Sequence, residues 1–132
     1  MEIEEIRKIL PEPDVDYLLE KEYKFDVHQA GSDIHVIINH FAFPDPYQPN
    51  QASLLIILPA GYPSANPDMF WTHPDIKLSG DRWPTSSEYH QDFDGKSWQR
   101  WSRHMAAGGW RAGVDNLRTY MTSISREIVK GI

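Results

Sequence analysis

The sequence contains no cysteine among its 132 residues. This absence excludes disulfide bonds, zinc sites with thiolate ligands and thiol nucleophiles. Long apolar runs are also missing, because the longest, residues 54–58, is far shorter than the roughly 20 residues that span a bilayer. The first ten residues, MEIEEIRKIL, lack the basic start and apolar core of a secretory signal. We therefore expect a cytoplasmic protein that does not associate with membranes.

The sequence has fewer basic than acidic residues. Thirteen Lys and Arg oppose nineteen Asp and Glu, which gives a net charge of −6. Nucleic-acid binding requires a basic surface, so we expect no nucleic-acid partner. The acidic excess lies in residues 1–66, which carry four basic and eleven acidic residues. An acidic solvated face is the simpler interpretation, and a docking surface for a basic partner is the alternative.

What is present is the composition of a folded domain, with 40% hydrophobic and 24% charged residues. We expect a single domain over residues 1–132. Apolar spacing predicts a helix over 2–10, and prolines then end it, so that 1–13 form an N-terminal helix and a Pro-rich lead-in. Asp14 is predicted to cap a second short helix that runs through Leu19.

Alternating apolar residues predict four consecutive strands over 23–30, 34–43, 52–58 and 68–72. Residues 73–109 lack a regular pattern and hold most of the tryptophans. A C-terminal helix is predicted over 110–129, with one apolar face formed by Val114, Leu117, Met121, Ile124 and Ile128. This order predicts an α+β fold, in which a four-stranded antiparallel meander is packed against an N-terminal helix and a C-terminal amphipathic helix.

The passage PAGYPSANPDMFWTHPD, residues 59–75, resembles the centre of the ubiquitin-conjugating enzyme (UBC, or E2) fold. In that family a strand ends in a Pro-x-x-Tyr-Pro-x-x-Pro-type turn, and a short strand and a His-Pro-Asn motif follow. Here His73-Pro74-Asp75 occupies the motif, and Trp110-Arg111-Ala112-Gly113 resembles the family's Trp-x-Pro turn. The matching residues of the turn and strand are Pro59, Tyr62, Pro63, Asn66, Pro67 and Phe70.

The resemblance covers about residues 14–131, and KSWQRWSRH, residues 96–104, is most similar to bacterial members. Those members occur in operons with ubiquitin-like proteins, activating enzymes and JAB-type peptidases. The resemblance therefore implies a UBC-like fold and a role in bacterial ubiquitin-like modification. It implies as partners a ubiquitin-like protein, an activating-like enzyme and possibly a JAB-type peptidase.

The sequence departs from the family at the positions that carry its chemistry. The family's acyl-carrying Cys would fall near Trp83, within residues 80–87, where Ser86 and Ser87 are the nearest hydroxyls. Serine forms only an oxygen ester, and its hydroxyl needs a base for activation. Asp75 replaces the Asn credited with stabilising the oxyanion, and a carboxylate would repel that charge.

The residues predicted for the site fall into two sets. The acyl-carrier set is Trp83, Ser86 and Ser87, with His73, Asp75 and His104 nearby, in the active-site-like region 73–109. The binding set is Tyr62, Pro63, Trp98, Arg100, Trp101 and Arg103.

Each of these residues also has a structural interpretation, which the sequence favours. Tyr62 and Pro63 would shape a turn, His73 would bond to nearby backbone, and Trp98 and Trp101 would anchor the core. The alternative for the two tryptophans is a binding patch with flanking arginines. No cofactor and no metal site are predicted, because His90 and His104 lack further ligands at a recognisable spacing.

Three functions stay open. The first is a conjugating-enzyme-like protein that carries or binds a ubiquitin-like protein, with its Cys either replaced in this chain or naturally missing. The second is an inert binding module similar to the ubiquitin-conjugating-enzyme variants of eukaryotes. The third is a hydrolase that uses His73, His90, His104 and neighbouring Asp residues.

Overall fold

A computed structural model describes residues 2–104 and 108–132 and confirms the α+β class. In the described residues, no helix combines the length and the apolar composition that crossing a membrane would require. The elements, in chain order, are α1 (Ile3–Ile9), α2 (Glu12–Glu20), β1 (Lys24–Ala30), β2 (Asp33–Ala42), β3 (Gln51–Leu58), β4 (Phe70–His73), the 3-10 helix η1 (Ser79–Asp81), β5 (His90–Phe93), β6 (Lys96–Trp101) and α3 (Leu117–Lys130).

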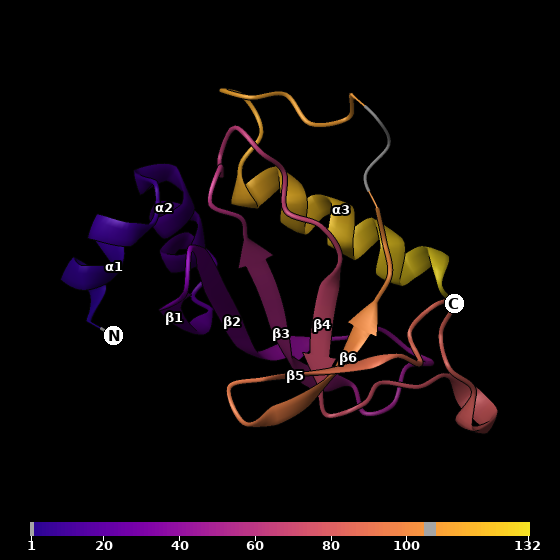
Figure 1. Ribbon diagram of the computed structural model, residues 1–132. Coiled ribbons are helices and arrows are strands. Elements are labelled where there is room, and N and C mark those ends of the chain that lie inside the picture. The colour runs from indigo at the N-terminus through magenta and orange to yellow at the C-terminus, as the bar shows by residue number, and fades with distance from the viewer. Residues whose placement is uncertain (1, 105–107) are drawn as a thin grey trace.

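The sheet has six antiparallel strands in the order β1-β2-β3-β4-β6-β5 (Figure 1). The predicted meander is present as β1 to β4, but the prediction of four strands was wrong. Residues 90–101, which were expected to be irregular, form the β5–β6 hairpin around Asp94 and Gly95. Both turn residues have positive φ, 55° and 78°, which is typical of the tight Asp-Gly hairpin turn. The Asp94-Gly95 dipeptide is therefore a hairpin signal within the stretch that was expected to be irregular.

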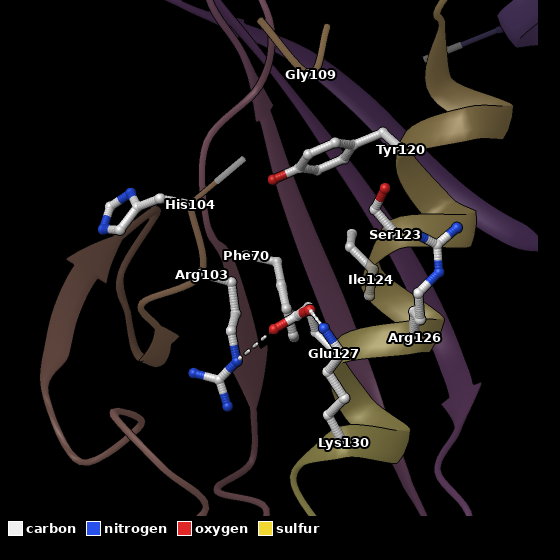
Figure 2. Close-up of a pocket in the computed structure, with 10 residues that line it drawn as sticks. All are labelled: Phe70, Arg103, His104, Gly109, Tyr120, Ser123, Ile124, Arg126, Glu127 and Lys130. Atoms are coloured by element: carbon white, nitrogen blue, oxygen red, sulfur yellow. Dashed lines mark ion pairs between the residues drawn. The ribbon is translucent and has the colours of Figure 1, made fainter. Parts of the chain in front are cut away.

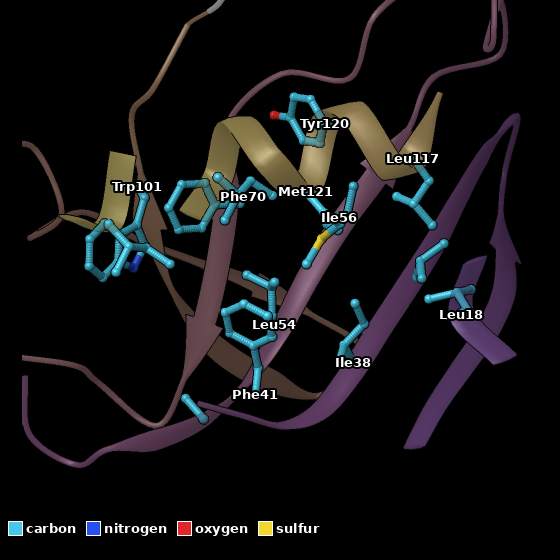
Figure 3. Close-up of a cluster of buried hydrophobic side chains, with 14 of the residues drawn as sticks. Leu18, Ile38, Phe41, Leu54, Ile56, Phe70, Trp101, Leu117, Tyr120 and Met121 are labelled. Atoms are coloured by element: carbon cyan, nitrogen blue, oxygen red, sulfur yellow. The ribbon is translucent and has the colours of Figure 1, made fainter. Parts of the chain in front are cut away.

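The main core lies between the sheet and the helices (Figure 3). Leu54 and Ile56 of β3 are fully buried on the face that α3 covers with Leu117 and Met121. Alternate residues of a strand point to opposite faces, so Leu55, between them, points to the other side. The predicted packing of the amphipathic C-terminal helix on the sheet is confirmed.

The start of this helix differs from the prediction. α3 begins at Leu117, and its N-cap Asn116 forms a reciprocal capping box with Thr119. Val114, predicted on the apolar face, precedes the helix and is 57% exposed. The periodic pattern extended the helix too far, because a capping box fixes the first turn more strongly than one additional apolar residue does.

The opposite face of the sheet is covered by the β5–β6 hairpin. Phe93 of β5 packs edge-on against Trp71 of β4 and against His35 of β2, with ring centroids 5.5 and 5.6 Å apart. Neither β4 nor β2 is adjacent to β5 in the sheet order. The hairpin therefore folds back across this face and buries a second apolar cluster, which consists of Leu55, Trp71 and Trp98.

Asp14 does not cap α2, contrary to the prediction. The helix begins at Glu12, with Pro11 as its N-cap and Pro13 in its first turn. Proline is tolerated there because the first N–H groups of a helix have no intrahelical partner. Asp14 instead lies in the first turn and is fully buried against α3.

Candidate functional site

The His73-Pro74-Asp75 segment begins at the last residue of β4 and borders a shallow hollow that His90 and Ser97 complete. Asp75 Oδ1 lies 2.8 Å from His90 Nε2, and His90 Nδ1 lies 3.0 Å from the carbonyl oxygen of Glu88. Both ring nitrogens of His90 thus face oxygen acceptors. This arrangement fastens the segment to β5 and engages both ring nitrogens of His90 within the protein.

His73 contacts the other strand of the hairpin. Its Nδ1 is 3.0 Å from the carbonyl oxygen of Ser97, and its ring lies 5.8 Å from that of Trp98. This is the structural role that the sequence favoured for His73. His104 is paired with Asp68, 2.8 Å away. In the described part of the chain, none of the three histidines is hydrogen-bonded to a serine or threonine hydroxyl, as a hydrolase with a serine or threonine nucleophile would require.

A buried glutamine, Gln99, holds this segment in place, although no local sequence pattern marks it as buried. Gln99 Nε2 donates to the carbonyl of Ile76 at 2.9 Å, and Gln99 Oε1 accepts from Ile76 N at 2.7 Å and from Thr72 Oγ1 at 2.9 Å. Trp101 Nε1 donates to the same Thr72 hydroxyl at 3.0 Å. This satisfied network fixes the backbone directly after Asp75 against β6.

The segment predicted to carry an acyl group, residues 80–87, offers no activated nucleophile. Ser87 is fully buried, and its Oγ donates to the carbonyl of Pro84 at 2.7 Å. Ser86 is exposed, but no histidine or carboxylate is hydrogen-bonded to its hydroxyl in the described residues. The half-buried ring of Trp83 lies 4.3 Å from Lys77 Nζ and edge-on to His90.

The tryptophans of the predicted binding set are in the interior. Trp98 is 1% exposed and Trp101 is 0% exposed, so neither ring forms a surface patch. Arg100 stacks on Tyr89, 4.1 Å from the ring centroid. Arg103 donates from Nη1 to the carbonyl of Thr85 at 2.7 Å, which ties the acyl-carrier segment to the end of β6.

Tyr62 and Pro63 connect three parts of the fold. The Tyr62 hydroxyl donates to Asp14 Oδ2 at 2.6 Å, and Asp14 Oδ1 accepts from Leu117 N, the first residue of α3, at 3.1 Å. The carbonyl of Pro63 accepts from Trp110 Nε1 at 2.9 Å. Burial, and secondarily the hydrogen bond to Asp14, raise the pKa of the Tyr62 hydroxyl. Tyr62 is therefore a neutral donor that fixes the turn.

The described residues form a deeper pocket, of about 410 Å³, between the ends of β4 and β6 and one side of α3 (Figure 2). Glu127 forms two ion pairs in this pocket. Its Oε1 lies 3.4 Å from Arg103 Nε on the opposite wall, and its Oε2 lies 3.3 Å from Lys130 Nζ on the same helix. Of the predicted residues, this pocket contains Arg103 and His104. Its lining residues are Phe70, Arg103, His104, Gly109, Tyr120, Ser123, Ile124, Arg126, Glu127 and Lys130.

The pocket is cationic, although the protein is acidic overall. Arg103, Arg126 and Lys130 outnumber the single carboxylate of Glu127. Burial raises the pKa of the Tyr120 hydroxyl, which stays neutral and donates to the carbonyl of Met69 at 2.6 Å. An anionic group is the ligand that this charge balance favours. The α3 side chains were missed because helical periodicity marks only the apolar face.

The helices, the meander and the His-Pro segment at the end of β4 together define an E2-like α+β protein. The sequence model of prokaryotic E2 family E matches residues 10–130, so the chain belongs to this family. The resemblance to bacterial E2-like proteins that the motifs indicated is thus confirmed. Neither the curated proteins nor the solved structures include a significant match.

Proposed function

We propose that this E2-like chain is catalytically inert and binds a ubiquitin-like protein without carrying it. The observation that supports this most directly is chemical. The chain has no thiol, and the buried Ser87 hydroxyl in the expected acyl-carrier segment is already bonded to Pro84. A thioester needs a sulfur, and an exposed serine without a paired base does not attack an acyl group efficiently.

The surroundings of Asp75 support the same proposal. Its carboxylate is held 2.8 Å from His90, where the family motif has a neutral amide side chain that can donate a hydrogen bond. An acyl-transfer site needs donors at the position of the developing oxyanion. The carboxylate of Asp75 in its ionised form can only accept. The segment thus lacks the hydrogen-bond donor that the Asn of the family motif would supply.

Binding without transfer makes a prediction about covalent adducts. After incubation with ATP, an activating-like enzyme and a ubiquitin-like protein of the kind that the family resemblance implies, intact mass spectrometry should show no adduct on this chain. A Ser86→Cys variant is the matched comparison, because it places a thiol on the exposed segment. An adduct on the native chain that resists dithiothreitol and is released by hydroxide would be an oxygen ester, and would contradict the proposal.

The cationic pocket beside α3 is the surface that we expect to receive an acidic segment of the ubiquitin-like protein. Titration of the isotope-labelled chain should shift NMR resonances of α3 and of residues 101–104. Arg126→Glu should weaken binding at least about 5-fold, which is roughly 1 kcal/mol, by replacing attraction with repulsion.

Lys24→Glu is the control for this variant, since it makes the same charge change on β1, far from the pocket in the sheet order. It should leave the dissociation constant unchanged. Unchanged spectra at millimolar partner concentration would contradict the binding function. If both variants weakened partner binding equally, the binding function would stand, but the pocket would be excluded as the binding site.

A further inference from the structure

Three potential metal ligands converge on the face of the sheet that the β5–β6 hairpin covers. His28 of β1 and His35 of β2 are directly paired across the two strands. Their rings lie 5.0 Å apart on the same face. Asp94 lies in the tight turn of the β5–β6 hairpin and contacts both histidines, although β1 and β5 are at opposite ends of the strand order. The hairpin's fold-back across the sheet is what brings the third side chain to the first two.

The spacing of the ligand atoms is close to that of a tetrahedral metal site. Asp94 Oδ2 lies 2.9 Å from His28 Nε2 and 3.3 Å from His35 Nδ1, and all three ligand atoms lie within 4.8 Å of one another. With zinc–ligand bonds of 2.0–2.2 Å, neighbouring ligands of a tetrahedron are about 3.3 Å apart. The 3.3 Å separation matches this value, the 2.9 Å separation is slightly shorter, and the third is at most 4.8 Å, so the three side chains would have to shift slightly to surround an ion.

The cluster leaves a polar atom unsatisfied within the protein. His28 Nε2 is shielded from solvent, and its short distance to Asp94 does not meet the geometry of a hydrogen bond. A nitrogen of each imidazole lies within 3.3 Å of the same carboxylate oxygen, Asp94 Oδ2. Buried polar atoms are nearly always paired, so an atom of this kind calls for an explanation. A cation placed among the three ligand atoms would satisfy all of them.

We propose that His28, His35 and Asp94 bind a Zn²⁺ ion. Two imidazoles and one carboxylate suit Zn²⁺, whereas Mg²⁺ and Ca²⁺ prefer a shell of oxygen ligands. His35 is buried, but the side chains of His28 and Asp94 are 35% and 42% exposed, so solvent reaches parts of both side chains beside the shielded His28 Nε2. A water molecule is the expected fourth ligand there.

The ion would fasten the hairpin tip to β1 and β2. Phe93, next to Asp94, already packs edge-on against His35, so the carboxylate is positioned before the metal binds. This inference does not depend on the proposed function, because it concerns other residues and another face of the sheet.

The chain provides matched controls for the experiment. Asp75–His90 and Asp68–His104 are His–Asp pairs with the same 2.8 Å separation, and the described residues place neither in a group of three ligands. Tag-free full-length protein, freed of metal with EDTA and dialysed, would be titrated calorimetrically with ZnCl₂. We expect saturation at one ion per chain. His28→Gln and Asp94→Asn should each weaken Zn²⁺ binding at least about 10-fold, because even residues that only orient a metal ligand change affinity 10- to 100-fold.

His104→Gln should leave the Zn²⁺ affinity unchanged. A second measurement needs no variant: one equivalent of Zn²⁺ should shift the imidazole ¹⁵N resonances of His28 and His35 in the native chain, but not those of His90 and His104. Unaltered affinity in Asp94→Asn would overturn the proposal, as would shifts spread over all histidines. Titration that does not saturate at one equivalent would mean an adventitious ion only, and would also overturn it.

Discussion

Trp101→Ala should lower the free energy of unfolding by about 4 kcal/mol, the largest effect that we expect from a single substitution in this chain. The indole is fully buried and stacks on Phe70, with ring centroids 5.2 Å apart. It also packs against Phe43 and Tyr47, and its Nε1 donates to Thr72. The substitution leaves a large cavity and removes the indole donor from the buried Gln99 network. Urea unfolding followed by circular dichroism would measure the loss.

Trp83→Ala is the control, since the half-buried Trp83 ring lies near the surface beside Lys77. Its removal should cost less than about 1.5 kcal/mol. If Trp101→Ala leaves too little folded protein to measure, Trp101→Phe keeps most of the packing and should still lower stability by more than Trp83→Ala does. A Trp101→Ala variant that kept full stability but lost partner binding would support a binding patch instead.

Asp14→Ala should cost about 2 kcal/mol. The substitution leaves the Tyr62 hydroxyl and the Leu117 N–H without their acceptor, and each unsatisfied buried donor costs about 1–3 kcal/mol. Part of the loss is recovered, because the fully buried carboxylate no longer has to be desolvated. Tyr62→Phe removes only one of the two hydrogen bonds and should cost less. Equal stability of Asp14→Ala and the native chain would show that the hydrogen bonds do not contribute.

The same residue predicts a dependence of stability on pH. Burial raises the pKa of the Asp14 carboxyl above its ordinary value of 3.8, and the hydrogen bonds from Tyr62 and Leu117 offset this only in part. The folded state therefore holds this proton more tightly than the unfolded state does. Asp14 then lowers stability as the pH rises from 3.8 through the folded-state pKa.

Asp14→Asn isolates this contribution, because it removes the titrating group and keeps the size of the side chain. The stability of the native chain minus that of Asp14→Asn should decrease across that pH range and stay constant above it. Urea unfolding at several pH values would measure the difference. A difference that increases with pH would mean that the hydrogen bonds dominate and that the pKa is lowered instead.

Local patterns in the sequence were enough for much of the fold. The alternation in residues 23–58 and the apolar spacing of Leu117, Met121, Ile124 and Ile128 predicted β1 to β3 and α3, because burial of one face imposes these periods. The family resemblance came from the order of the Pro-rich turn and the His-Pro segment. The hairpin was also within reach, since Asp94-Gly95 is a strong turn signal.

The candidate site was less predictable, because its contacts join distant segments. Gln99 lies between the buried Trp98 and Trp101 in the same strand, and no local feature marks it as buried. It nevertheless forms hydrogen bonds with the backbone of Ile76. Asp14 was predicted to cap α2 from its sequence position. Its carboxylate instead accepts a hydrogen bond from Leu117 N, because α3 packs against α2. The cationic pocket likewise needs Arg103 and the side of α3 to be brought together.

The sequence by itself determined what chemistry this protein lacks. Without cysteine no thioester can form on the chain, whatever its fold. The tertiary structure decided which side chains meet. His35 and Asp94 are 59 residues apart, and no spacing rule connects them. His35 Nδ1 and Asp94 Oδ2 lie 3.3 Å apart because the sheet is curved. The β5–β6 hairpin, which lies beyond β4 in the sheet order, therefore folds back as far as β2. That curvature arises from strand twist and from the packing of Phe93 on His35 and Trp71, which no local pattern encodes.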